Sequence, residues 1–216
     1  YYPSLQYDNQ SRPIISYYAK TPGDLRFAAF YNGNWSLSTI DSAGDVGRYS
    51  SLALNLATGR WAMAYEDTGH GSFKYAEQGK SAWTLTNVDP TTKSGGAYIS
   101  LVFNPKTKLP AFSYYDAHNA DLKYAAFNGS AWSTQTFAAH NSQGLYTNLS
   151  FNASGVADIL YDNKSNDSVF RATQSGKVWS VTQITTDGGH WISRAVSSSK
   201  QTFAYLKGTT ITLKDL

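Results

Sequence analysis

Hydrophobic and polar residues alternate along most of the chain, in short runs separated by turn residues. The segment from 51 to 88 contains the runs SLALN, RWAMAYED, SFKYAEQG and AWTLTNV. A period of two places every second side chain on one face of a pleated strand, whereas a helix requires a period near 3.6. This segment therefore predicts four short strands joined by turns, and the same alternation recurs before and after it.

Four landmarks of this pattern repeat at nearly constant spacing along the chain. Each unit has an opening aromatic residue, a second tyrosine, a basic residue nine or ten positions later and, in the first four units, a closing tryptophan. The opening residues are Tyr2, Tyr49, Tyr98, Tyr146 and Trp191, and the second tyrosines are Tyr17, Tyr65, Tyr114, Tyr161 and Tyr205. The basic residues are Arg26, Lys74, Lys123, Arg171 and Lys214, and the tryptophans are Trp35, Trp83, Trp132 and Trp179.

A four-stranded unit repeated five times at this spacing predicts an all-β fold, a β-propeller of five blades, each an antiparallel meander. We expect one domain over 1–216, with units at about 2–48, 49–97, 98–145, 146–190 and 191–216. The last unit has room for three strands before Leu216, so its blade is expected to be incomplete. A sixth blade, or a further segment beyond this sequence, is the alternative.

The residues between the strands indicate specific turns. Asp8, Asn55, Asn104 and Asn152 follow the first strand of their units, where an Asx side chain can cap a hairpin turn. Asn32-Gly33 and Asn128-Gly129 predict type I′ turns, which need positive φ at both central residues.

Composition narrows the class of protein. Aromatic residues make up 15% of the chain and only two glutamates occur, which favours half-buried strands over helices. The net charge of +3 is small and dispersed, so nucleic acid is not an expected partner. No apolar run is long enough to span a membrane, and there is no cysteine. Because the chain begins at Tyr1 without a methionine or leader, we expect a secreted or cell-surface protein from which an upstream segment has been removed.

The repeated basic residues are candidate ligand contacts. Arg26, Lys74, Lys123 and Arg171 would form a ring of cations able to bind carboxylate, sulfate or phosphate groups of a glycan. Alternatively, each aliphatic stem packs over an aromatic ring and the charged head pairs with a nearby aspartate such as Asp116 or Asp162. A residue kept in every unit is what a repeated packing solution produces, so the structural alternative is favoured.

Aromatic and acidic residues give a second set of candidates. Tyr65, Tyr114 and Tyr161 could stack on sugar rings or fill the wedges between blades. In the third unit, Asp116, His118 and Asp121 occupy the loop between the second and third strands, which is individual to that unit. Asp158 occupies a position where the other units have apolar residues or threonine. It is either a functional acid or a buried polar residue whose hydrogen bonds are satisfied. Trp61 and Trp191 lie outside the series of closing tryptophans and are candidates for a local role.

No metal or cofactor site is expected. The histidines His70, His118, His140 and His190 show no metal-ligand spacing, and no cysteine assists them. Phosphate-binding, dinucleotide-binding, calcium-loop and serine-nucleophile motifs are also absent from the sequence.

Two segments carry a resemblance to known families. DLRFAAFYNGNW (24–35) and DLKYAAFNGSAW (121–132) resemble repeats of secreted bacterial propeller proteins, and in outline those of propeller lectins of the tachylectin type and the fungal fucose-binding type. The fucose lectins place an acidic residue close after the arginine, whereas Phe27-Ala28 follows Arg26 and Tyr75-Ala76 follows Lys74 here. Glu77 has no acidic counterpart in the other units. The resemblance implies sugar binding without implying fucose as the sugar.

These observations leave three hypotheses for function. The first is a non-catalytic, exported module that binds carbohydrate or an extracellular protein through inter-blade clefts or one propeller face. The second is a glycoside hydrolase or lyase with acids at the axis, which the scarcity of carboxylates disfavours. The third is a purely architectural propeller belonging to a larger exported protein.

Overall fold

The computed structural model describes residues 1–90, 96–138, 143–196 and 201–216. All of the secondary structure in these ranges is β, in four four-stranded antiparallel sheets and one three-stranded sheet. This confirms the predicted five-bladed β-propeller with an incomplete last blade. Among the described residues no helix is long and apolar enough to cross a membrane.

Each blade is a meander whose strands follow one another in sequence order. The first blade contains β1 (Ser4–Tyr7), β2 (Pro13–Ala19), β3 (Asp24–Tyr31) and β4 (Asn34–Asp41), and the second contains β5 (Val46–Asn55), β6 (Arg60–Asp67), β7 (Ser72–Gln78) and β8 (Trp83–Asp89). The third contains β9 (Gly96–Phe103), β10 (Pro110–Asp116), β11 (Asp121–Phe127) and β12 (Trp132–Ala138), and the fourth contains β13 (Gln143–Phe151), β14 (Ala157–Asn163), β15 (Ser168–Ser175) and β16 (Val178–Gln183). The fifth contains β17 (His190–Val196), β18 (Gln201–Lys207) and β19 (Thr210–Asp215).

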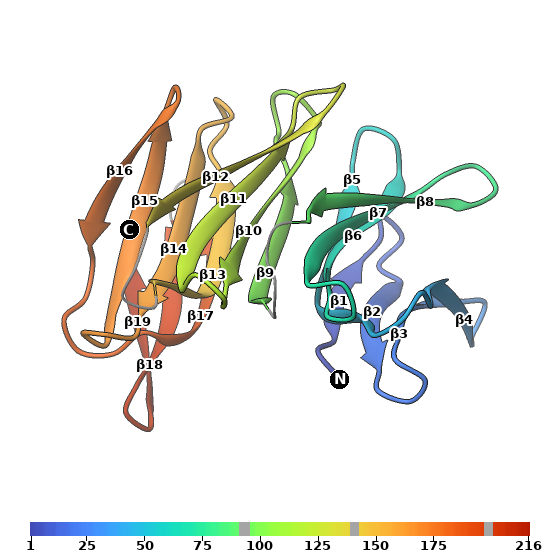
Figure 1. The fold of residues 1–216 in the computed structure, drawn as a ribbon, viewed down its shortest axis with the longest axis horizontal. Helices are drawn as coiled ribbons and strands as arrows, with labels where there is room; N and C mark the ends of the chain where they lie inside the picture. The colour runs from blue at the N-terminus through green and yellow to red at the C-terminus, as the bar shows by residue number, and fades with distance from the viewer. Residues whose placement is uncertain (91–95, 139–142, 197–200) are drawn as a thin grey trace.

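The blades are arranged in series, with their first strands on the inside. Figure 1 shows the blue first blade at one side of the molecule and the orange and red strands of the last two blades at the other, with β4 and β16 near opposite margins of the view. The first strands of consecutive blades contact one another, from β1 to β5, β9, β13 and β17. Each blade therefore packs mainly against its neighbours in sequence.

The core is divided into wedges between adjacent blades. One cluster joins Ile14, Leu25 and Phe27 of the first blade to Leu52, Met63 and Tyr65 of the second, and equivalent clusters join each later pair. The second strands of the second, third and fourth blades face a wedge on both sides, and β14 is accordingly buried along its whole length. Burial on both faces accounts for apolar residues at successive positions, as in Trp61–Tyr65 of β6.

The turns agree with the sequence except at one position. The side chains of Asp8, Asn55, Asn104 and Asn152 all accept hydrogen bonds from backbone amides two to four residues later, as predicted. Asn32 and Gly33 both have positive φ, as a type I′ turn requires. The prediction for Asn128-Gly129 is wrong, because the Asn128 side chain instead accepts bonds from the amides of Ser130 and Ala131 in a longer loop.

Candidate functional site

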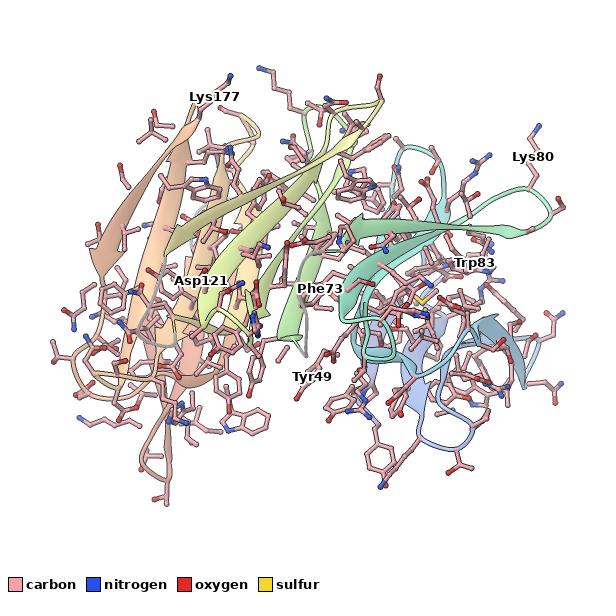
Figure 2. The ribbon with its side chains drawn as sticks, in the orientation of Figure 1. Tyr49, Phe73, Lys80, Trp83, Asp121 and Lys177 are labelled. Carbon is pink, nitrogen blue, oxygen red and sulfur yellow. The ribbon has the colours of Figure 1, made fainter. Side chains whose placement is uncertain are left out.

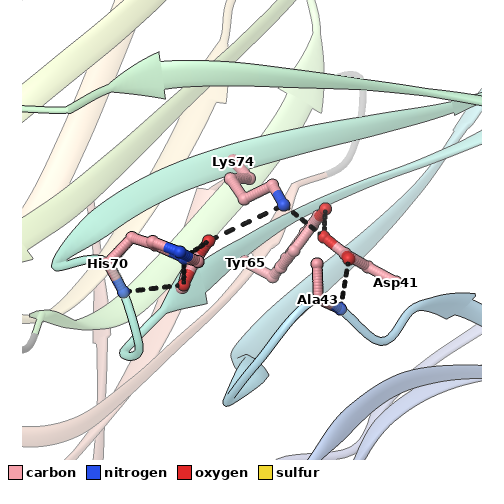
Figure 3. A network of polar contacts seen from close by, with 6 residues as sticks. Asp41, Ala43, Tyr65, His70 and Lys74 are labelled. Carbon is pink, nitrogen blue, oxygen red and sulfur yellow. Dashed lines mark hydrogen bonds and ion pairs between the residues drawn. The ribbon is translucent and has the colours of Figure 1, made fainter.

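Lys74 lies in a polar network between the first and second blades (Figure 3). Its ammonium group donates to Asp41 at the end of β4 and lies 3.6 Å from Asp67. The Tyr65 hydroxyl donates to the same Asp41 carboxylate at 2.8 Å. Burial opposes the ionised form of Asp41, but the hydrogen bonds from Lys74 and Tyr65 outweigh it, so the pKa of Asp41 is held below its ordinary value.

The next interface repeats this arrangement. Lys123 donates to Asp89 at the end of β8 and lies 3.6 Å from Asp116. The Tyr114 hydroxyl donates to Asp89 at 2.6 Å. Both tyrosine rings are fully buried, and burial raises the pKa of Tyr65 and of Tyr114. A cation, a phenol and a carboxylate therefore satisfy one another inside each of these interfaces.

The other predicted basic residues have different partners. Arg26 pairs with Asp24 of its own strand at 2.8 Å, and its side chain is 30% exposed. Arg171 pairs with Asp158 at 2.5 Å, and its side chain is 32% exposed. Tyr161 is fully buried, and its hydroxyl donates to Gln143 at 3.3 Å. The basic residues of the repeat thus differ in solvent exposure. Lys74 and Lys123 are largely buried, while Arg26 and Arg171 reach solvent.

The loop of the third blade that the sequence singled out is built around one buried carboxylate. Asp116 accepts hydrogen bonds from the amides of His118 and Asn119 and from the side-chain amide of Asn119. His118 is exposed, and Asp121 is partly exposed at the position opposite Asp116 in the ladder between β10 and β11. The loop brings these three residues together, with Asp116 turned inward and His118 outward.

Sequence reasoning missed the acids that organise these interfaces. Asp41 and Asp89 each follow the closing tryptophan of their blade by six residues, yet they contact the basic residue of the next blade. The signal was available as a fixed offset, but the partner lies across a blade boundary. The third and fourth units have Ala138 and Thr185 at this offset, so they lack an acid at the position of Asp41 and Asp89.

A cleft lies between the second and third blades. It encloses 480 Å³, and its walls come from β7, β8 and the turn that leads into β12. Polar wall residues are Glu77, Thr84, Thr86, Asn87 and Ser130, and aromatic wall residues are Tyr75, Phe127 and Trp132. The cleft therefore combines ring faces with hydroxyl, amide and carboxylate groups.

The aromatic residues of this cleft pack against one another. The Trp132 ring is half-buried and lies 5.0 Å from the Tyr75 ring and 5.4 Å from the Phe112 ring, between centroids. The Tyr75 hydroxyl donates to Glu77 at 3.4 Å, and burial raises the pKa of Tyr75. Glu77 is half-buried and open to the cleft. It is the residue without an acidic counterpart in the other repeats, so this cleft is chemically distinct from the others.

Two other groups bear on catalysis and metal binding. Asp158 is buried and bonded by two guanidinium groups, those of Arg171 and Arg194. Asp162, Asp167 and His190 place one ligand atom each within 4.8 Å of one another, across the fourth and fifth blades. Sequence spacing gave no sign of this grouping because Asp162 and His190 are 28 residues apart and meet only where β17 packs against the fourth blade. His140 lies outside the described residues.

Comparison with known proteins gives matches by structure alone. No family model and no curated protein matches the chain. A protein of unknown function from Dyadobacter fermentans superposes with a TM-score of 0.67 at 12% identity, covering 100% of this chain and 78% of the other. The fucose-specific lectin of Aleuria aurantia gives 0.64 at 13% identity, covering 98% and 76%.

An enzyme appears among the similar structures as well. The exo-β-1,3-galactanase of Phanerochaete chrysosporium, solved with galactose, gives a TM-score of 0.57 at 11% identity, covering 99% of this chain and 60% of the other. At these identities the likeness concerns the fold. The chain thus shares the β-propeller fold of a fucose lectin and of a galactanase.

Proposed function

We propose that this chain is a non-catalytic carbohydrate-binding module, secreted or displayed at a cell surface, that holds a sugar in the cleft between the second and third blades. The observation that carries the proposal is the composition of this cleft, where the half-buried Trp132 ring lies near the Glu77 carboxylate. An aromatic face stacks on the apolar face of a pyranose ring. A carboxylate and neighbouring hydroxyl and amide groups fix the orientation of the sugar hydroxyls.

The carboxylate inventory supports binding over catalysis. Glycoside hydrolysis ordinarily uses a pair of carboxyl groups on either side of the scissile bond. Among the residues that line the cleft, Glu77 is the one carboxylate. Asp158, the other candidate acid, is engaged by Arg171 and Arg194. These features favour a site that retains a sugar without cleaving it.

The residues predicted from the repeat keep a secondary place in the proposal. A ligand would reach Lys74, Lys123 or the buried tyrosines only by displacing bonds that already satisfy them. Arg26, Arg171 and His118 reach solvent and remain available for further glycan contacts. The buried residues of the predicted set hold the exposed ones in position and do not themselves contact the ligand. They include Tyr65, Tyr114, Tyr161 and Asp116.

The test uses methyl α-L-fucoside and β-1,3-galactotriose as probes, measured by calorimetry and saturation-transfer NMR. Trp132→Ala and Glu77→Gln are each expected to weaken the stronger-binding probe about tenfold, because stacking and a charge-assisted hydrogen bond are lost. The matched control is Trp83→Ala, which removes the tryptophan at the same repeat position. Trp83 packs on Phe27 between the first and second blades and is not among the residues that line the proposed cleft.

Several outcomes would contradict the proposal. Absence of binding by both probes at millimolar concentration would remove it, and so would equal binding by the wild type and Trp132→Ala. Release of reducing sugar from β-1,3-galactotriose by the wild type would overturn the non-catalytic part. Thermal denaturation of each variant separates a lost sugar contact from a lost fold.

A further inference from the structure

The opening residues of the five repeats form a continuous aromatic collar. We define the collar as Tyr2, Tyr49, Tyr98, Tyr146 and Trp191. Successive ring centroids lie 4.2, 5.5, 4.2 and 5.1 Å apart, so each ring contacts the next across a blade boundary. Residues distant in sequence thereby make one surface along the inner strands.

Every member of the collar has an unusual backbone conformation. The φ angles of the five residues lie between 48° and 58°, in the left-handed region that bulky side chains rarely adopt. The ladder between the first and second strands changes register at Tyr49, Tyr146 and Trp191. Such a bulge re-aims a side chain that regular alternation would place elsewhere. Five equivalent strained positions indicate that the direction of these side chains matters.

Burial alone does not account for this strain. Trp191 is 68% exposed and Tyr2 is 38% exposed, while Tyr49, Tyr98 and Tyr146 are half-buried. A ring turned inward to fill the core would be covered, whereas these rings present area to solvent. Exposed, adjacent aromatic residues mark a binding surface more often than an isolated exposed ring does.

Two concave hollows lie between the collar rings. One, of 190 Å³, is lined by Tyr2, Tyr49 and Tyr98 with Pro3, Ser50 and Ile99. The other, of 240 Å³, is lined by Tyr98, Tyr146 and Trp191 with Ile99, Thr147 and Ile192. Tyr98 and Ile99 line both, so the hollows lie next to each other. Their walls offer ring faces, aliphatic groups and hydroxyls.

The charges around the collar are mixed in sign. The charges of Arg48 and Glu66 interact electrostatically with the Tyr49 phenol, and that of Asp162 interacts with the Tyr98 phenol. The His190 ring lies 5.7 Å from the Tyr146 ring. Burial and the neighbouring Tyr2 hydroxyl raise the pKa of Tyr49 to about 12, so this phenol is neutral at physiological pH and can donate or accept a hydrogen bond. The electrostatic field is therefore neither uniformly positive, as a phosphate would require, nor uniformly negative, as a quaternary ammonium ion would require.

We propose that the aromatic collar is a second binding surface, for a neutral oligosaccharide whose pyranose rings stack on Tyr98, Tyr146 and Trp191. The apolar faces of such a chain match the rings, and its hydroxyls match the phenols that line the two hollows. The collar is separate from the inter-blade cleft. In Figure 2, Tyr49 lies in the lower part of the molecule, whereas Lys80 and Lys177, in turns between third and fourth strands, lie in the upper part. The equivalent turn of the third blade forms one wall of the cleft.

The experiment uses three neutral glucans, cellohexaose, laminarihexaose and maltohexaose, with saturation-transfer NMR and calorimetry. We expect at least one of them to bind, and Trp191→Ala to weaken that binding about fivefold, whereas Trp191→Phe, which keeps a ring, changes it less than about twofold. Because Trp191 is exposed, its replacement should leave the fold intact. The control Trp35→Ala removes a 46% exposed tryptophan of the outer strand β4 and should leave binding unchanged.

The readout distinguishes the collar from the cleft. Trp132→Ala should leave binding of the responding glucan unchanged if the collar holds it. Absence of binding by all three glucans at millimolar concentration would overturn the proposal. Equal affinity of the wild type and Trp191→Ala would overturn it too, and in that case loss of binding in Trp132→Ala would assign the glucan to the cleft. The collar proposal stands or falls independently of the function assigned to the cleft.

Discussion

Lys74 and Arg26 occupy equivalent repeat positions in adjacent blades but have different surroundings. The Lys74 side chain is 14% exposed and bonds Asp41 across the blade boundary, whereas that of Arg26 is 30% exposed and pairs within its own strand. We expect Lys74→Met to lower the free energy of unfolding by about 3 kcal/mol, because a buried carboxylate loses its cation. Arg26→Met should cost less than about 1 kcal/mol. Urea unfolding of both variants measures the difference.

The contribution of Lys74 should depend on pH in a defined direction. The pKa of Asp41 in the folded protein lies below its ordinary value of 3.8, so the ionised form is favoured by folding. Stability from this pair is therefore present above pH 3.8 and is lost as the pH falls through the folded pKa. The deficit of Lys74→Met should shrink in acid, while that of Arg26→Met stays small. A deficit equal at neutral and acid pH would mean that lost packing, and not charge, explains it.

At the scale of the strand, the collar depends on how each inner strand begins. Gly47 and Gly144 each stand two residues before a collar tyrosine and have φ of 106° and 104°. A Cβ at Gly144 would lie 2.8 Å from the Cα of Leu122 in the preceding blade. Gly144→Ala should therefore destabilise the protein by about 3 kcal/mol, from a clash added to an unfavourable φ.

The control for Gly144→Ala is Gly33→Ala in the turn between β3 and β4. Gly33 also has a positive φ, of 79°, but a Cβ there would meet nothing within 4 Å. The expected loss is about 1 kcal/mol, from backbone strain alone. Thermal denaturation compares the two variants, and equal losses would show that the close approach to Leu122 is relieved at little cost.

The strand scale also shows where prediction from the sequence stops. Period-two runs and Asx turns are local, so the strands, the blades and most turns were predictable. The collar rings were recognised as repeat landmarks, yet their contacts depend on left-handed φ at Tyr49 and Tyr146, which no residue preference would predict. The spacing of glycine two residues before Tyr49, Tyr98, Tyr146 and Trp191 was the available signal. The wall of the cleft could not be predicted because Glu77 and Trp132 come from different blades.

At the scale of the whole molecule, the blades form a series in which each blade is stabilised mainly by packing against its neighbours. In such an arrangement a local loss is felt by adjacent units and fades beyond them. The fifth blade is the extreme case among the described sheets. It has three strands, β19 is mostly exposed, and its described core consists of Phe203 and Tyr205 packed on Leu160 and Val169 of the fourth blade. It should open before the central blades do.

Hydrogen exchange tests this gradient through two equivalent phenylalanines. Phe203 and Phe112 are both fully buried, each two residues before the repeated tyrosine of its blade. Truncation of such a side chain costs about 3 kcal/mol or more, so Phe203→Ala should speed exchange of the β18 amides about a hundredfold. The amides of β6, three blades away, should change little. Phe112→Ala removes the same ring from the wedge between the second and third blades and should speed exchange in β6 and β10. Uniform acceleration in all sheets by Phe203→Ala would show that the described blades unfold as one cooperative unit.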